Sequence, residues 1–83
     1  MRPMTADDIR GQLNMEITDK FGNLKAFTRA LGVDYLTYRR YINGERKMST
    51  ELLMESLAVL DVDPVLFFRL VRTRIEAETP AAE

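Results

Sequence analysis

The stretch ALGVDYLTYRRYINGER, from Ala30 to Arg46, contains the signals that decide how this chain folds. Gly32 can adopt the left-handed conformation that ends a helix, and Asp34 can cap the helix that follows. Val33, between them, is apolar and suited to turn inward. The stretch therefore predicts the end of one helix, a tight turn and the start of another helix at Tyr35.

The helices on either side of this turn are short, and each has one apolar side. The first is expected from Leu24 to Leu31, with Asn23 as its cap and Phe27 among its inward residues. The second is expected over 35–43. Its apolar stripe comprises Tyr38, Tyr41 and Ile42. Two short helices joined by a glycine-led turn, the second with a polar and aromatic outer face, are typical of a helix-turn-helix arrangement.

Three further helices are expected around this pair. Thr5 and Asp8 resemble a capping box ahead of a helix from Ala6 to about Lys20. Ser49 can cap a fourth helix, whose apolar residues are Leu53, Leu57 and Leu60. The fifth is expected over 64–78, because proline is favoured at the first helical position. Since no stretch has a strand pattern, the prediction is an all-α fold, a compact five-helix bundle.

The fifth helix has an inward and an outward side. Either Leu66 or Phe67 is expected to face the core, followed by Leu70 and Val71. The arginines of this helix are expected outside: Arg69, Arg72 and Arg74. Phe67 and Phe68 are adjacent and cannot both point the same way, so one of them is expected at the edge of the core or in a dimer contact.

The length and composition of the chain indicate one globular domain. We expect the 83 residues to form a domain over 1–78 with a flexible tail at 79–83. The 46% hydrophobic and 30% charged residues are typical of such a domain. No apolar run approaches the roughly 20 residues needed to cross a bilayer, and a charge stands where a signal peptide would be apolar. We therefore expect a cytoplasmic protein without membrane contact.

The residues that most enzymes need are missing from the sequence. There is no cysteine and no histidine, which excludes disulfides, zinc sites of the Cys/His kind and histidine acid-base chemistry. The sequence also shows no nucleophile-base pair, metal cluster or phosphate-binding glycine loop. An enzyme is therefore not expected, and neither is a metal, a cofactor or a small-molecule ligand.

Charge is unevenly distributed along the chain. Overall, 12 basic residues face 13 acidic ones, a balance that by itself does not support nucleic-acid binding. From Tyr35 to Lys47, however, the only acidic residue is Glu45. The basic residues in this range are Arg39, Arg40, Arg46 and Lys47. An isolated arginine pair on a helix is more often solvated than bound to a ligand, but beside a helix-turn-helix turn it indicates a surface that meets an anion.

The run from Phe27 to Arg46 aligns without gaps to the form L-A-x-x-L-G-V-(S/D)-x-x-T-(L/I)-S-R-(Y/W)-L-N-G-E-R, with Thr28 in place of the usual alanine and Arg39 in place of the usual serine. The chain therefore resembles the Cro/repressor type of helix-turn-helix domain, the XRE-like family of bacterial and phage regulators. Downstream, MSTELLMESLAVLDVDPVLFFR is similar to the family's fourth helix and the start of its fifth. Leu24 stands where the family usually has a glutamine that bonds a DNA phosphate. The resemblance covers about 23–69 and implies a lambda-repressor-like fold.

The resemblance also implies a binding site on DNA. The helix over 35–43 would lie in the major groove, where each base pair presents a distinct pattern of donors, acceptors and methyl groups. The residues implied to read base edges are Tyr35, Leu36, Thr37 and Arg40. The residues implied to bind phosphates are Asn23, Arg39, Asn43, Arg46 and Lys47.

The function expected from these features is sequence-specific binding of double-stranded DNA by a transcriptional regulator, a repressor of phage or mobile-element type. One such domain reads few base pairs, so a homodimer on a pseudo-palindromic site is expected, with helix 64–76 as a candidate contact. An alternative stays open: a protein-interaction module, such as an antitoxin or an adaptor, on the same fold with weak or no DNA binding. Leu24 and the acidic balance of the chain favour this alternative.

Overall fold

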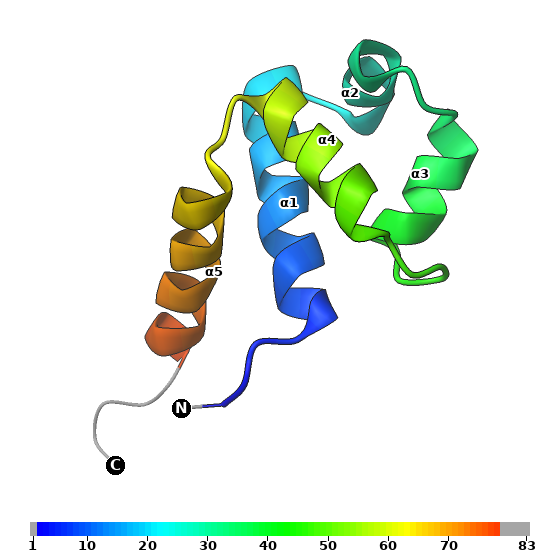
Figure 1. Ribbon diagram of the computed structural model, residues 1–83. Helices are drawn as coiled ribbons and strands as arrows, with labels where there is room; N and C mark the ends of the chain where they lie inside the picture. Colours follow the sequence, from blue (N-terminus) through cyan, green and yellow to red (C-terminus); the bar gives the residue numbers. More distant parts are fainter. Residues whose placement is uncertain (1, 79–83) are drawn as a thin grey trace.

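The computed structural model describes residues 2–78, which contain five α-helices joined by short connections (Figure 1). They are α1 (Ala6–Phe21), α2 (Leu24–Leu31), α3 (Tyr35–Ile42), α4 (Thr50–Leu60) and α5 (Pro64–Glu78). These residues contain no strand, so the predicted all-α class is confirmed. The tail predicted at 79–83 lies outside the described residues.

α1 is the central helix of the arrangement. α5 runs along one side of it, α4 crosses in front, and α2 and α3 lie on the other side (Figure 1). α1 contacts α2, α4 and α5, whereas α2 contacts both α3 and α4. α3 therefore lies on the side of the molecule opposite α5.

The helices begin at the predicted N-caps. The capping box at the start of α1 is formed, with the Asp8 N–H donating to Thr5 Oγ1 and the Thr5 N–H donating to Asp8 Oδ2. Asn23, Asp34 and Ser49 each accept a hydrogen bond from the backbone N–H three residues further along, over 2.8, 3.0 and 3.1 Å respectively. These caps satisfy backbone donors that a helix start otherwise leaves without a partner.

Two helix ends differ by one residue from their predicted bounds. α1 continues to Phe21, because the N–H of Gly22 still donates to a carbonyl one turn back, over 2.9 Å. α3 stops at Ile42, and Asn43 is the cap at which the chain leaves the helix. Sequence patterns locate the caps, but the last hydrogen bond of a helix decides where it ends.

A single core joins the helices. α1 contributes Leu13 and Ile17, and α5 contributes three residues on one stripe. These three are Phe67, Val71 and Ile75. The choice between Leu66 and Phe67 is thus decided, because Phe67 is 0% exposed and Leu66 is 51% exposed.

The other predictions for α5 are met in part. Leu70 was expected to face the core and is only half-buried, because the buried stripe passes through Val71 instead. The arginines are exposed as predicted, although Arg74 Nη1 donates to Gln12 Oε1 over 3.4 Å. Phe68 is the aromatic residue at the edge of the core, half-buried and packed edge-to-face on Phe67.

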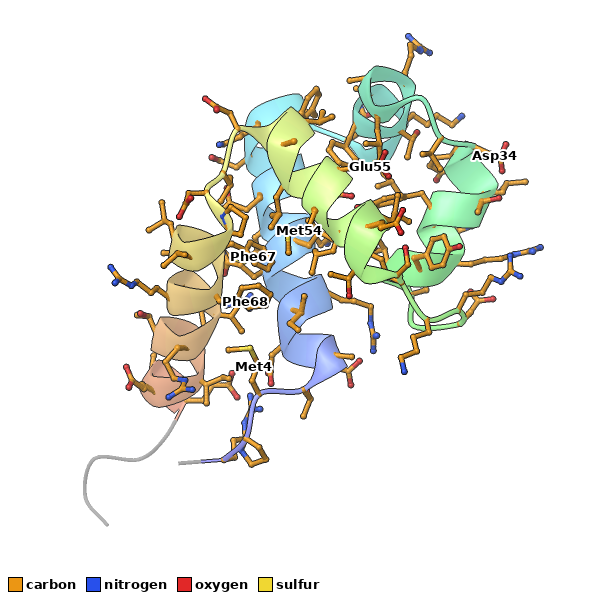
Figure 2. The ribbon with its side chains drawn as sticks, in the orientation of Figure 1. Met4, Asp34, Met54, Glu55, Phe67 and Phe68 are labelled. Carbon is orange, nitrogen blue, oxygen red and sulfur yellow. The ribbon has the colours of Figure 1, made fainter. Side chains whose placement is uncertain are left out.

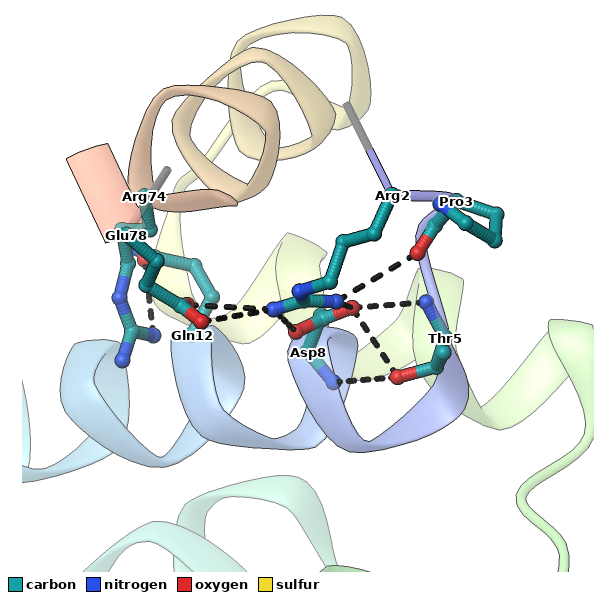
Figure 3. Close-up of polar contacts among 7 residues, drawn as sticks. All are labelled: Arg2, Pro3, Thr5, Asp8, Gln12, Arg74 and Glu78. Carbon is teal, nitrogen blue, oxygen red and sulfur yellow. Dashed lines mark hydrogen bonds and ion pairs between the residues drawn. The ribbon is translucent and has the colours of Figure 1, made fainter. Parts of the chain in front are cut away.

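Arg2 ties the segment before α1 to the last turn of α5 (Figure 3). Its guanidinium donates to both carboxylate oxygens of Asp8 over 2.7 Å and to both of Glu78 over 3.0 and 3.2 Å. These bonds from Arg2, with the Thr5 N–H, hold the pKa of Asp8 well below its usual range. The stabilisation from this depressed pKa is present above the ordinary carboxyl pKa and is lost as the pH falls. Because exposed ion pairs add little stability, the main effect is to fix the position of the segment.

Candidate nucleic-acid interface

The turn between α2 and α3 is held by hydrogen bonds to the end of α2. Gly32 has φ 81° and ψ 28°, the left-handed conformation predicted from the sequence. Its N–H and that of Val33 both donate to the Thr28 carbonyl, over 2.9 and 3.1 Å. Val33 packs against the core as predicted, and Asp34 then caps α3. These local bonds fix the direction in which α3 leaves the turn.

A buried tyrosine anchors α3 from beneath. Tyr38 is fully buried, and its ring packs edge-to-face on Phe27 of α2 with ring centres 5.4 Å apart. Its hydroxyl lies 2.8 Å from Ser56 Oγ of α4. Because Ser56 donates its proton to the Leu52 carbonyl, Tyr38 is the donor in this pair. α3 is therefore held to both α2 and α4, and its opposite side stays outside the core.

Replacing Tyr38 by phenylalanine tests this anchor. We expect Tyr38→Phe to lower the free energy of unfolding by about 1 kcal/mol, because a buried hydrogen bond is lost while Ser56 keeps its bond to the Leu52 carbonyl. Burial raises the pKa of Tyr38 to about 12. The neutral phenol is thus favoured in the fold, so stability should decline as the pH rises above the ordinary tyrosine value of about 10. Urea unfolding between about pH 7 and pH 11 measures both effects.

Tyr41→Phe is the matched control for this experiment. Tyr41 is half-buried on the same helix, and its hydroxyl has no hydrogen-bond partner within residues 2–78. We expect this variant to keep the stability of the parent protein within about 0.5 kcal/mol. An equal loss in both variants would contradict the anchoring role of the bond between Tyr38 and Ser56.

The predicted base-reading residues all lie on α3, but their surroundings differ. Leu36, 58% exposed, and Arg40, also exposed, are four residues apart and share the outer side of the helix. Tyr35 is half-buried, and Lys25 Nζ of α2 lies 5.5 Å from its ring centre. Thr37 Oγ1 donates to Asp34 Oδ2 over 3.1 Å, so only its oxygen remains to accept a further bond.

The predicted phosphate-binding residues lie before α2 and around the C-terminal end of α3. Asn23 uses Oδ1 to cap α2, which leaves its amide nitrogen as the donor group on an exposed residue. Beyond α3, the chain folds back on the helix end, because the N–H groups of Glu45 and Arg46 both donate to the Arg40 carbonyl. Asn43, Arg39, Arg46 and Lys47 are exposed around this end.

The sequence interpretation missed two cations on α2, Lys25 and Arg29. Both are exposed, and with Asn23 and Tyr35 they line a hollow of about 410 Å³ between the starts of α2 and α3. The sequence did contain a signal for them: they are four residues apart, on the side of the helix away from Phe27.

A third missed cation, Arg10 of α1, supports the loop after α3. A Cβ atom built on Gly44 would lie 3.1 to 3.4 Å from three atoms of the Arg10 guanidinium, so the planar group lies directly against this residue. Gly44 has φ 81°, which also favours glycine. Arg10 is ion-paired with Asp7, one turn earlier on α1. Only the folded arrangement brings α1 and this loop together, so no local sequence pattern indicates the contact.

The cations of residues 24–48, here called the basic segment, are not neutralised by ion pairs within the described residues. They are Lys25, Arg29, Arg39, Arg40, Arg46 and Lys47. Only Asp34 and Glu45 are acidic in this range, whereas the rest of the chain has six basic and eleven acidic residues. Positive charge is thus concentrated on α2, α3 and the following loop, although the whole chain has a net charge of -1.

Within 2–78, every buried side-chain nitrogen or oxygen has a hydrogen-bond partner, and no group of three or more acidic side chains is placed to hold a metal ion. None of the helices described is long and apolar enough to cross a membrane. Comparison of the chain with family models, with curated proteins and with solved structures gave no significant match.

Proposed function

We propose that this protein is a sequence-specific regulator that binds double-stranded DNA, a transcriptional repressor of phage or mobile-element type. In this proposal, α2, the turn at Gly32 and α3 form a helix-turn-helix unit in a lambda-repressor-like bundle, and α3 enters the major groove. The observation that carries the proposal is the basic segment, whose six cations lie on α2, on α3 and on the loop that follows α3. Such a concentration of unpaired cations matches the charge of a phosphate backbone.

Two residues of α3 are the main candidates for reading sequence. Arg40 presents a guanidinium that can bond O6 and N7 of guanine together, and Leu36 offers an apolar contact to a thymine methyl group. Tyr35 lies at the edge of this side, near Lys25. Thr37 is proposed as a weaker reader, because its proton is already donated to Asp34.

The remaining polar groups are proposed to hold the protein on the duplex. Lys25 and Arg29 join the five phosphate-binding residues predicted from the sequence, and they line the hollow at the start of α2. The backbone N–H groups of this helix start favour a phosphate at the same place. Contacts of this kind fix the register of the protein without reading bases.

A homodimer on a pseudo-palindromic site is proposed, because a single unit of this type contacts few base pairs. Leu66 and Leu70 of α5 are the candidate contact, since Leu66 is half exposed and Leu70 is half-buried next to it. α5 lies on the side of the molecule opposite α3, so such a contact leaves the basic segment uncovered (Figure 1).

Two substitutions test the proposed roles against each other. After a binding sequence has been selected from a random duplex pool, Arg40→Ala should weaken binding to that sequence by about 1 to 3 kcal/mol and relax the preference at one base position. Lys47→Ala should weaken binding evenly across cognate and random duplexes and lower the salt slope by about one. Mobility shift across a salt series measures both results. Equal effects of both substitutions on cognate and random duplexes would count against these roles.

The second candidate function, a protein-interaction module on the same fold, is favoured by the exposed apolar side chain of Leu36 on α3. A protein interface on α3 would bury this residue, whereas a DNA interface uses it for a single methyl contact. A defined protein partner bound through Leu36, with no duplex binding at low salt, would decide for the second candidate.

A further inference from the structure

An apolar groove runs over a part of the molecule that the proposed DNA interface does not use. Its first part, a hollow of about 450 Å³, lies between α1, α4 and α5. Its second part, about 630 Å³, continues along α5 toward the segment before α1. Phe68 lines both parts. Met54, Phe68 and Met4 follow one another along this line (Figure 2).

The groove is lined mainly by apolar side chains. The principal apolar residues of the first part are Ile9, Leu13, Met48, Leu53, Met54 and Phe68. Met4 and Val65 extend the apolar lining in the second part. Methionine side chains adapt to different shapes and are common on surfaces that bind helices. Apolar side chains gathered at a surface hollow are the kind of lining that interaction sites on proteins have.

The charges that line the groove have one sign. Lys47 lines the first part together with Arg10, which is ion-paired with Asp7, and Arg69 and Arg72 line the second. No carboxylate is among the lining residues of either part, although the chain outside the basic segment is predominantly acidic. The groove therefore combines an apolar floor with positively charged edges.

We propose that this groove binds an amphipathic α-helix of a partner protein, with apolar residues facing Met54 and Phe68 and acidic residues along its flanks. An apolar helix side placed in a groove is a common recognition mode, with anchors spaced as i, i+3, i+4 and i+7. The acidic flanks follow from charge complementarity with Lys47 and Arg69. A second copy of this chain fits less well, because a two-fold contact would bring the same cations of both copies together.

The proposed site shares one residue with the basic segment, Lys47. An acidic side chain of the bound helix would compete with DNA phosphates for this cation. This competition rests on the function proposed above. It predicts that the bound helix and the duplex weaken each other's binding by the same factor. The groove would thus receive an inhibitory partner.

Two synthetic helical peptides of about 18 residues provide the probe. Both have leucines at the anchor spacing, and their flanking residues are either glutamate or lysine. Fluorescence anisotropy should show that the glutamate peptide binds at least about tenfold more tightly than the lysine peptide. The methionine methyl NMR signals of Met4, Met48 and Met54 should shift on binding, whereas that of Met15, which lies in a different hollow on α1, should not.

Met54→Glu and Met15→Glu form the matched pair of variants. Both replace exposed methionines, 37% and 53% exposed, so both proteins should keep the fold, as checked by circular dichroism. We expect Met54→Glu to weaken the binding of the glutamate peptide by at least about tenfold. Met15→Glu should leave the affinity for this peptide unchanged. Equal binding of both peptides, absence of binding, or shifts centred on Met15 would overturn the proposal. So would methyl shifts that depend on protein concentration alone, which would indicate a second copy in the groove.

The experiment separates this proposal from the proposed function. Peptide binding is measured without DNA, so a peptide that binds while no duplex does supports the groove and refutes the regulator. Duplex binding without peptide binding supports the regulator and refutes the groove. If both bind, adding the peptide should release the duplex from the parent protein, and a ternary complex with unchanged affinities would overturn the inhibitory role.

Discussion

The affinity of this protein for duplex DNA is expected to fall by at least about 10³-fold when monovalent salt rises from about 50 to about 200 mM. The reason is the basic segment, whose six cations have no ion-pair partner within the described residues. Each phosphate that they neutralise releases condensed counterions, and high salt opposes this release. Mobility shift or anisotropy with a fixed duplex at four or more salt concentrations gives the slope.

Single substitutions assign this slope to particular cations. Lys25→Ala and Arg29→Ala should each lower the slope by about 0.9, because both residues line the hollow at the start of α2. Arg69→Ala is the matched control, since Arg69 is an exposed cation on α5, on the side of the molecule away from α3. A binding constant that does not respond to salt, or a slope that Arg69→Ala lowers equally, would refute the assignment of the interface to the basic segment.

Phe67→Ala is expected to lower the free energy of unfolding by about 3 to 5 kcal/mol. Phe67 is fully buried, and its ring packs edge-to-face on Phe68 with ring centres 5.3 Å apart. Removing the ring leaves a cavity in the core cluster, to which α1 contributes Leu13 and α5 contributes Val71. A small domain has only about 5 to 15 kcal/mol of stability in total, so this variant should be partly unfolded at physiological temperature. Thermal and urea unfolding followed by circular dichroism measure the loss.

Leu66→Ala is the control for this substitution. Leu66 precedes Phe67 on the same helix but is 51% exposed, so its replacement should change stability by no more than about 0.5 kcal/mol. Similar losses in the two variants would mean that α5 packs through a different side. The same result would remove Leu66 from the candidate dimer contact.

The helix boundaries could be predicted because their causes are local. Asn23, Asp34 and Ser49 each accept a bond from a residue three positions away, and Gly32 needs only its own left-handed conformation. Local sequence signals did not determine which side of α5 faces the core. Both Leu66 and Phe67 fit an apolar stripe, and only the contact with α1 selects Phe67.

The same distinction applies to the candidate site. The outward position of Leu36 and Arg40 follows from the apolar stripe through Tyr38, so it could be predicted from spacing on one helix. The reach of Arg10 to Gly44 joins residues of α1 and a distant loop, which no local pattern reports. The bond from Thr37 to Asp34 is local, but family resemblance alone suggested a base contact at Thr37 and did not reveal that its proton is already used.

The contact between Arg2 and Glu78 brings the two ends of the described chain together at one pole (Figure 3). This pole lies away from α3 (Figure 1). A label, a surface linker or a second module attached at Arg2 or at Glu78 would therefore lie on the same side of the molecule, away from the basic segment. A protein immobilised through either end would present α2 and α3 to the solution.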